Sequence, residues 1–530
     1  MRVKARKLVL ISEQQRGPNA TQDGEPTLKD WLLWLESLHP KKIDLGLDRI
    51  AQVADRLGLR PHTRQFAKRY PDYYPKLAII AGTNGKGSCV ESLTVLADQL
   101  GISHGSYTSP HVLSYNERFR INRKDAASEA ILKAFKAINE ARLDGEAVSL
   151  SYFEFATLTA FYLFAEAQLD FWIIEVGLGG RLDATNIIDA DLAIITAIAL
   201  DHEAILGSDI DSIAREKAGV LRPAQLCVLA ERSPPQALLD QAESLMTERI
   251  LNGSDYQIDT ERRCLDLYRL PGSQDLKQQP DSYDFCPFLP EESAAAAFNG
   301  FVELFKVEPK AFPELLERLE SSTLVGRFSV FEARENVFVK PSVGRSCDLR
   351  FPGGQSIVLD VAHNPAAIKR LANNLQSYLA HDDESGLDKS ALGQTRNVTV
   401  TAIFGMMADK DRRGGLKELA PFIDRWFPVS LASSTRAASA DLLAEDLLEV
   451  GVNQKTISVS ENISVSAKID EPLRQLLSNN AGSQAEKAPS EGDHILLIFG
   501  SFHTVQEALE YLTKQNLLND VEALVGSQRK

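Results

Sequence analysis

The residues from Gly82 to Ser88 read Gly-Thr-Asn-Gly-Lys-Gly-Ser and combine three glycines with a lysine and two hydroxyl groups. Glycine lets a backbone approach an anion closely, and the N–H groups of such a turn can donate to phosphate oxygens. Lys86 would then reach the terminal phosphates, and Ser88 stands where a hydroxyl group that binds metal or phosphate belongs. The loop is shorter than the strict Walker pattern and has an additional glycine after the lysine. We therefore predict a phosphate-binding loop, with a chance glycine turn as the alternative.

The segments on both sides of this loop have the pattern that would position it. Residues 77–80 are all apolar and predict a short buried strand. Apolar residues then recur at helical spacing from Val90 to Leu100, and Gly101 offers a C-cap. A strand, a glycine turn and a helix in this order would place a phosphate at the N-terminus of the helix.

Three more predicted strands end at polar residues that could bind a metal or a phosphate. They cover residues 102–108, 171–174 and 192–200, and they are followed by Ser109, Glu175 and Asp201-His202. Ligands of open parallel sheets bind beyond the carboxyl ends of the strands, so these residues should meet the phosphate loop at one edge. His202 taken alone would more simply be a packed or capping histidine. Together these positions predict a nucleotide and metal site.

The composition is that of a folded α/β protein in water and argues against several other classes. The 530 residues are too many for one core and predict two or three domains. A net charge of −15 argues against a nucleic-acid surface, and no apolar run is long enough to span a bilayer. The five cysteines are scattered, odd in number and without metal-ligand spacing, which suits a reducing cytoplasm.

Strands and helices alternate along the chain, which predicts an α/β fold with parallel sheets. We expect a P-loop-type parallel-sheet ATPase domain, a hinge near Val325–Phe328, and then a smaller Rossmann-like α/β domain. The expected boundaries are a flexible leader at 1–27, an ATP-binding and substrate-binding domain at 28–325 and a C-terminal domain at 326–530. The polar stretch up to about residue 284 predicts loops and edge strands, and residues 381–396 and 479–493 predict surface loops.

Eight short motifs together resemble the ATP-dependent amide-ligase family that contains the Mur ligases and the folylpolyglutamate synthases. They lie at residues 82–88, 108–111, 175–186, 199–202, 215–219, 326–328, 360–365 and 500–503. The resemblance is narrower still to the bacterial bifunctional dihydrofolate synthase/folylpolyglutamate synthases, and it extends from about residue 28 to about residue 515.

The resemblance implies roles for particular residues around ATP and magnesium. It implies ATP contacts from Thr83, Asn84, Gly85, Lys86, Gly87, Ser88, Ser293, Arg327 and Asp360. It implies Mg²⁺, one ion or two, held by Ser109, Glu175 and His202, and a carbamylated lysine at Lys217. Lys86, Lys217 and His202 are the implied catalytic residues. Ser293 departs from the family, which usually has an asparagine at this position.

The resemblance also implies an acceptor site and a reaction. The dihydropteroate pocket would be lined by Ser37, Leu38, His39, Pro40, Ser151, Tyr152, Phe153, Glu154, Leu182, Asp183 and Ala184. ATP would activate the acceptor as an acyl phosphate, and L-glutamate would then be added to dihydropteroate or to reduced folates. A ligase that acts on a cell-wall nucleotide precursor and a non-catalytic nucleotide-binding switch are the alternatives. The implied protein is a cytoplasmic monomer that binds neither nucleic acid nor membrane.

Overall fold

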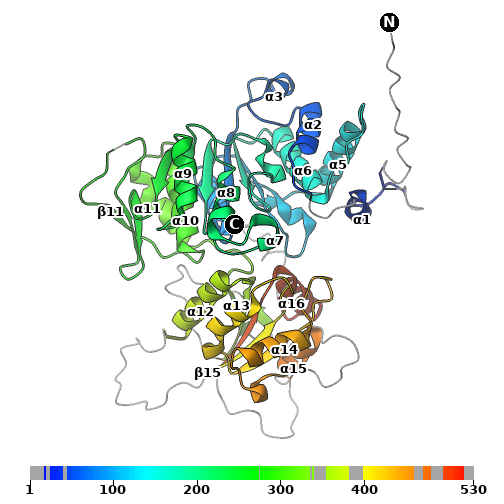
Figure 1. Cartoon of the computed structure of the whole chain (residues 1–530), viewed down its shortest axis with the longest axis vertical. Helices are drawn as coiled ribbons and strands as arrows, with labels where there is room; N and C mark the ends of the chain where they lie inside the picture. Colours follow the sequence, from blue (N-terminus) through cyan, green and yellow to red (C-terminus); the bar gives the residue numbers. More distant parts are fainter. Residues whose placement is uncertain are drawn as a thin grey trace.

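The structure of the chain is a computed structural model. It describes residues 17–18, 24–39, 44–273, 275–334, 337–339, 354–380, 398–458, 469–478 and 493–518. Two α/β units lie one above the other in Figure 1, the first coloured blue to green and the second yellow-green to red. Each unit is built around a large β-sheet of its own.

The sheet of the first unit has eight strands in the order β4-β3-β2-β5-β1-β6-β7-β8. They are β1 (Lys76–Ala81), β2 (His104–Tyr107), β3 (Phe119–Ile121), β4 (Lys124–Asp125), β5 (Phe171–Glu175), β6 (Leu192–Ile195), β7 (Leu226–Leu229) and β8 (Glu248–Leu251). The strands from β2 to β8 in this order are parallel, whereas β3 and β4 form an antiparallel edge. The carboxyl ends of the parallel strands therefore share one edge.

Strand β1 shows how the sequence builds a core on each face of this sheet. Leu77, Ile79 and Ala81 pack in one cluster, and Ala78 and Ile80 pack in another, which is the period of two of a strand buried on both faces. Helices that contribute to the first cluster are α1 (Leu28–Leu38), α2 (Asp48–Leu57), α3 (Arg64–Arg69), α5 (Ser128–Leu143), α6 (Tyr152–Glu166), α7 (Glu203–Leu206), α8 (Ile210–Ala218) and α9 (Gln236–Ser244). The second cluster is completed by α4 (Lys86–Gln99), α10 (Glu291–Leu304) and α11 (Phe312–Glu320).

A small antiparallel sheet extends the first unit beyond β8. Its strands are β9 (Tyr256–Asp259), β10 (Cys264–Leu267) and β11 (Asp281–Asp284), with β10 in the middle. Tyr256, Leu265 and Leu267 point into the core beside α10 and α11. The polar stretch that the sequence assigned to loops and edge strands is therefore a separate sheet with one buried face.

The second unit contains a six-stranded sheet in the order β13-β12-β14-β17-β15-β16. The strands are β12 (Ser329–Arg334), β13 (Val337–Val339), β14 (Gln355–Asp360), β15 (Val398–Phe404), β16 (Arg425–Pro428) and β17 (Asp493–Phe499). The last four are parallel, and β12 and β13 are antiparallel. Its helices are α12 (Pro365–Ala380), α13 (Arg412–Leu419), α14 (Ala440–Glu449), α15 (Asp470–Ser478) and α16 (Phe502–Lys514).

The predicted α/β fold class is confirmed, with antiparallel strands at one edge of each large sheet that the sequence did not distinguish. The division of the chain into domains near residue 325 stays a proposal. Most of the predicted leader, all of the predicted loop at 381–396 and all but the last residue of the one at 479–493 lie outside the described residues. Among the helices that are described, none is long and apolar enough to cross a membrane.

The loop between β2 and β3 belongs to the first unit and packs against the second unit. Val112, in this loop, belongs to the apolar cluster on one face of the second sheet. The buried carboxylate of Glu117 fixes the loop, because it accepts hydrogen bonds from the backbone N–H groups of Val112 (2.9 Å), Leu113 (2.8 Å) and Ser114 (2.5 Å). Ser109 stands at the start of the same loop, so its position depends on both units.

We expect Glu117→Gln to lower the free energy of unfolding by about 1–3 kcal/mol, because an amide that donates would face backbone N–H groups that also donate. Urea denaturation measures the change. Glu140→Gln, on the exposed surface of α5, is the matched control and should leave the stability within about 0.5 kcal/mol of the parent. Equal stability of the two variants would contradict the anchoring role of Glu117.

Candidate active site

The phosphate loop follows β1, and two of its positions require glycine. Gly82 has φ +150°, and a Cβ atom there would lie 1.8 Å from Thr196 Oγ1. Gly85, the N-cap of α4, has φ +89°, and a Cβ atom there would lie 2.3 Å from Ser293 Oγ. The loop therefore fits closely between the end of β6 and the start of α10. It lines a cleft between the two units, and the N-terminus of α4 is directed at this cleft.

Two lysines from distant parts of the chain donate to one carbonyl group of this loop. Lys86 Nζ lies 3.1 Å from Gly82 O, and Lys217 Nζ lies 2.8 Å from the same atom. Burial lowers the pKa of Lys86, and burial together with the charge of Lys86 lowers the pKa of Lys217 to about 7. Placing two amines side by side in a buried site is unfavourable unless an anion joins them. The pair is therefore a site for an anion.

Helix α8 is brought close enough to place Lys217 by two glycines. A Cβ atom at Gly180 would lie 2.7 Å from Glu216 O, and one at Gly219 would lie 2.3 Å from Arg181 Cβ. Arg181 N donates to Glu216 O at 2.8 Å, and its guanidinium group binds the Glu216 carboxylate. The loop of residues 177–183 therefore holds the last turn of α8 against the phosphate loop.

The three predicted metal ligands lie on the same side of the cleft. Glu175 is buried at the end of β5, and its Oε2 accepts from Ser109 N at 2.9 Å. Burial raises the pKa of Glu175, against the charge of Lys86. Burial and the charge of Lys410 lower the pKa of His202 to about 4, which leaves a neutral imidazole. Hydroxyl and carboxylate oxygens fit Mg²⁺ and a neutral imidazole can also bind a metal, so this donor set fits a divalent cation.

The donor set contains only two residues of the kinds that most often bind metals, Glu175 and His202. Within the described ranges, no group of three or more His, Cys, Asp or Glu side chains is placed to hold a metal ion. A metal at this site would therefore need the Ser109 hydroxyl, water or phosphate oxygens to complete its coordination.

Hydrogen bonds between the two units close the cleft beside these ligands. Asn84 and Asn364 exchange amide hydrogen bonds of 3.1 and 3.0 Å. Lys410 Nζ donates to Asp201 Oδ1, with less than a tenth of either side chain exposed. His363 and Lys410 hold the pKa of Asp201 well below its usual value, although burial opposes them. The sequence did not single out Lys410 as a site residue, although it follows a predicted strand just as Asp201 does.

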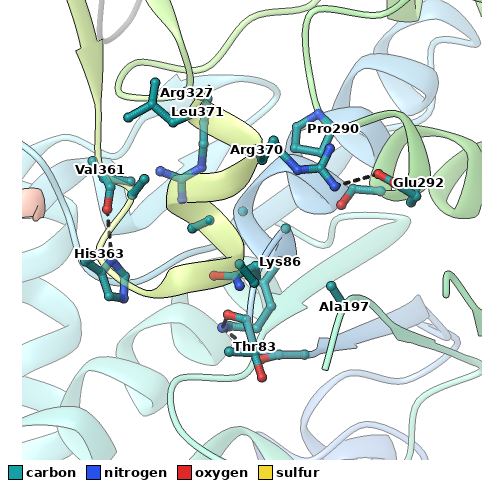
Figure 2. A pocket seen from close by; sticks show the side chains of 18 of the residues that line it. Thr83, Lys86, Ala197, Pro290, Glu292, Arg327, Val361, His363, Arg370 and Leu371 are labelled. Atoms are coloured by element: carbon teal, nitrogen blue, oxygen red, sulfur yellow. Dashed lines mark hydrogen bonds and ion pairs between the residues drawn. The ribbon is translucent and has the colours of Figure 1, made fainter. Parts of the chain in front are cut away.

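The second unit contributes two of the predicted ATP contacts. Arg327 and Asp360 line the cleft, and Asp360 is fixed by the backbone N–H groups of Phe328 (2.8 Å) and Ala362 (2.7 Å). Figure 2 shows Arg327, His363 and Arg370 across the cleft from Thr83 and Lys86. Arg370 also binds Glu292 at 2.8 Å, which is a second ion pair between the units.

The cleft has a volume of about 1710 Å³, which exceeds the usual size of a site for one small ligand. The predicted residues that line it are Thr83, Asn84, Gly85, Lys86, Gly87, Ser109, Glu175, His202, Lys217, Ser293, Arg327 and Asp360. Ser88 does not line it, because its hydroxyl group is buried on the first turn of α4. Ser434, Arg436, Ser501 and His503, which the sequence did not select as site residues, line the side formed by the second unit.

The predicted acceptor residues gather around residues 44–49 instead. His39 binds Asp44 (3.0 Å) and Ser149 (2.9 Å), and Arg49 joins Asp44 to Glu154. The third predicted segment reaches the same place, because Gly46 N donates to Leu182 O at 3.3 Å. Ser37, Leu38, Ser151, Tyr152, Phe153, Asp183 and Ala184 belong to these segments, whereas Pro40 lies outside the described residues.

Comparison with known proteins identifies the family. No family model matches the chain. The dihydrofolate synthase/folylpolyglutamate synthase of Haemophilus influenzae is 35% identical over 481 residues, which cover 91% of this chain and 96% of that protein. Its namesake from Escherichia coli strain K12 is 33% identical over 497 residues, covering 93% and 97%. The chain belongs to this family.

Solved structures of the family have the same fold. Escherichia coli FolC in complex with DHPP and ADP has a TM-score of 0.72 at 30% identity, covering 93% of this chain and 99% of that chain. A bifunctional folylpolyglutamate synthase/dihydrofolate synthase with Mn, AMPPNP and L-glutamate bound has a TM-score of 0.69 at 32% identity, covering 92% and 98%. The resemblance to this family that the motifs indicated is thereby confirmed.

We expect Lys86→Ala to slow amide formation by about a hundredfold or more, because it removes a charge beside the phosphate loop. Steady-state turnover measures the loss, and circular dichroism checks the fold. Lys76→Ala at the start of β1 is the matched control, since Lys76 is half-exposed and pairs with Asp191 away from the cleft. Near-normal turnover by a folded Lys86→Ala protein would contradict the assignment of this loop.

Proposed function

We propose that the chain is an ATP-dependent amide ligase that adds L-glutamate to dihydropteroate, making dihydrofolate, and adds further glutamates to reduced folates. The observation that carries this proposal is one cleft in which the charges of Lys86 and Arg327 act on the buried carboxylate of Glu175, and in which Lys217 shares the Gly82 carbonyl group with Lys86. Such a site favours a multiply charged anion together with a cation, as Mg²⁺-ATP provides. The acceptor and the amino acid that we propose are those that the names and solved structures of the family give.

The reaction has two steps. A carboxylate oxygen of the acceptor attacks the γ-phosphorus of ATP, the bond from that phosphorus to the bridging oxygen breaks, and ADP leaves. The neutral amine of glutamate then attacks the acyl carbon, inorganic phosphate leaves, and the nitrogen loses a proton to form the amide. Lys86 and the N-terminus of α4 stabilise the charge on the transferred phosphoryl group.

Ser109, Glu175 and His202 are the residues that we propose as ligands of Mg²⁺, one ion or two. When bound, the metal neutralises phosphate charge and orients the transferred group. Thr83, Asn84, Gly85 and Gly87 would contact the phosphates through their backbone, and Ser293, Arg327 and Asp360 would contact the nucleotide from the other walls. Ser293 supports a close fit to the phosphate loop, although serine is shorter than the asparagine usual in the family.

We propose that Lys217 carries a carbamate. Carbon dioxide reacts only with an uncharged amine, and a lysine with a pKa of about 7 is half neutral at neutral pH. The neutral amine attacks the carbon of carbon dioxide, one carbon–oxygen π bond opens to give the carboxylate, and one N–H proton is released to solvent. The neutral amine thereby becomes an anion with two oxygens. Such an anion beside Lys86 would relieve the repulsion between the two amines and could bind a metal or a water.

Three further statements complete the proposal. The acceptor would occupy the predicted residues around Asp44 and Arg49, with its pteridine away from the cleft. We place the protein in the cytoplasm, which is supported by four buried cysteines that are all free, and we propose that it is a monomer because the resemblance to the family implies one. Arg436 on the second unit lines the cleft, paired with Asp409 at 2.6 Å, and offers a guanidinium group for the incoming amino acid.

Phosphate release from ATP tests the function. Dihydropteroate with L-glutamate, or a reduced folate with L-glutamate, should stimulate release and yield a product longer by one glutamate. A muramoyl nucleotide should not stimulate it. Stimulation by the muramoyl nucleotide would favour a cell-wall ligase, and binding of ATP with no acceptor-dependent release would favour the nucleotide-binding switch.

We expect Lys217→Ala to be nearly inactive and to regain activity when a short-chain carboxylate is added, since the carboxylate replaces the carbamate oxygens. In the parent, the carbamate detected by mass spectrometry after trapping should increase from pH 6 to pH 8, because the neutral amine increases with pH around a pKa of about 7. Parent-like activity of the variant, or an unmodified amine at pH 8 with carbon dioxide present, would contradict the carbamate.

A further inference from the structure

Arg118 is a buried cation at the end of the loop between β2 and β3. Its relative exposure is 8%, and its Nε donates to His111 Nδ1 at 2.9 Å. The guanidinium carbon lies 5.4 Å from the ring centre of Tyr115 and 5.6 Å from that of Tyr152. Two aromatic faces and one imidazole therefore hold the group in a defined orientation.

Arg118 lacks the carboxylate partner that its neighbours have. Arg120 binds Asp125 at 2.9 Å, and Arg123 binds Glu91 at 2.7 Å. Among the described residues, no carboxylate forms an ion pair with Arg118, and its only side-chain hydrogen bond is the one to His111. The nearby carboxylate of Glu117 is already occupied by three backbone N–H groups.

A buried guanidinium group without a carboxylate is costly, because burial removes the water that would solvate its charge. The two terminal nitrogens of Arg118, Nη1 and Nη2, form no hydrogen bond within the described residues. They are not cut off from solvent. They are therefore available to an anion that enters from outside the chain. A planar guanidinium group matches a carboxylate, which it can bind through two parallel hydrogen bonds.

The position of Arg118 connects the cleft to the predicted acceptor residues. His111, its hydrogen-bond partner, follows Ser109 and Pro110, both of which line the cleft. Tyr152, whose ring also lies against the Tyr115 ring, begins α6 beside the acceptor residues Phe153 and Glu154.

We propose that Arg118 binds the carboxylate of the acceptor and directs it at the γ-phosphate. This inference rests on the proposed function. The acceptor carboxylate has to approach ATP and Glu175, all of which are negatively charged, so a cation beside its path offsets the repulsion. The acceptor carboxylate is favoured over a nucleotide phosphate because Arg118 packs against Tyr115 and Tyr152, next to the acceptor residues, and does not line the cleft that contains the phosphate loop.

The test compares two acceptors that differ only in charge at the reacting group. Dihydropteroate and its carboxamide are titrated by calorimetry into the full-length protein saturated with Mg²⁺ and AMPPNP. The parent should bind the carboxylate more tightly than the carboxamide by about tenfold to a hundredfold, the range of a charged hydrogen bond. Arg118→Gln should bring the ratio close to one. A merely structural role would weaken both ligands equally and leave the ratio unchanged.

Arg120→Gln is the matched control. Arg120 lies on β3, two residues after Arg118, and it carries the same charge but has carboxylate partners in Asp125 and Glu91. The control variant should keep the ratio of the parent. Arg118→Lys keeps the charge without the planar fork and should give a ratio severalfold below that of the parent, which tests the inference even if Arg118→Gln does not fold.

Four results would overturn the inference: a ratio near one in the parent, a parental ratio in Arg118→Gln, a parental ratio in Arg118→Lys, or loss of AMPPNP affinity in Arg118→Gln with the ratio unchanged. The last result would assign Arg118 to the nucleotide. If the parent forms the glutamyl product but the ratio does not depend on Arg118, only this inference fails. A parent that binds neither pteridine refutes the proposed function and this inference with it.

Discussion

The site depends on the cost of placing like charges together away from water. Lys86 and Lys217 donate to the same carbonyl oxygen, that of Gly82. Burial lowers the pKa of both, and the charge of Lys86 lowers the pKa of Lys217 further. Beside the phosphate loop, Glu175 has its pKa raised by burial. Each of these charges is unfavourable alone and favourable once a phosphate and a cation lie between them. The binding of Mg²⁺-ATP therefore removes this electrostatic cost.

The fold supports these charges with rigid contacts on backbone atoms. Gly180 and Gly219 let α8 approach the glycine-rich loop so closely that any side chain at either position would meet neighbouring atoms. Glu117 fixes the loop that carries Ser109 through three backbone hydrogen bonds. Because both arrangements are held by buried contacts, thermal motion of exposed side chains has little effect on the distances between the charged groups.

The sequence predicted what depends on local pattern and missed what depends on contacts between distant segments. The strand before Gly82, the helix after it and the polar residues at strand ends all followed from apolar spacing. The short antiparallel strands β3, β4, β12 and β13 did not, because two to six residues carry too little periodicity. The pairs Asn84–Asn364 and Lys410–Asp201 join residues more than two hundred positions apart, and a single sequence contains no signal for such pairs.

Arg118 shows how a ligand site can be recognised from a buried charge that has no partner of opposite charge among the described residues. Its neighbours Arg120 and Arg123 have carboxylates of their own, so the chain is able to pair arginines in this region. Arg118 is at least as buried as these two and has no carboxylate partner within the described residues, so an anion from outside the chain would stabilise it beyond what His111 and the two tyrosines provide. The same reasoning applies to Lys86 and Lys217. In each case the missing charge is negative, and the anions that an amide ligase must bring together, a triphosphate and a carboxylate, are of that sign.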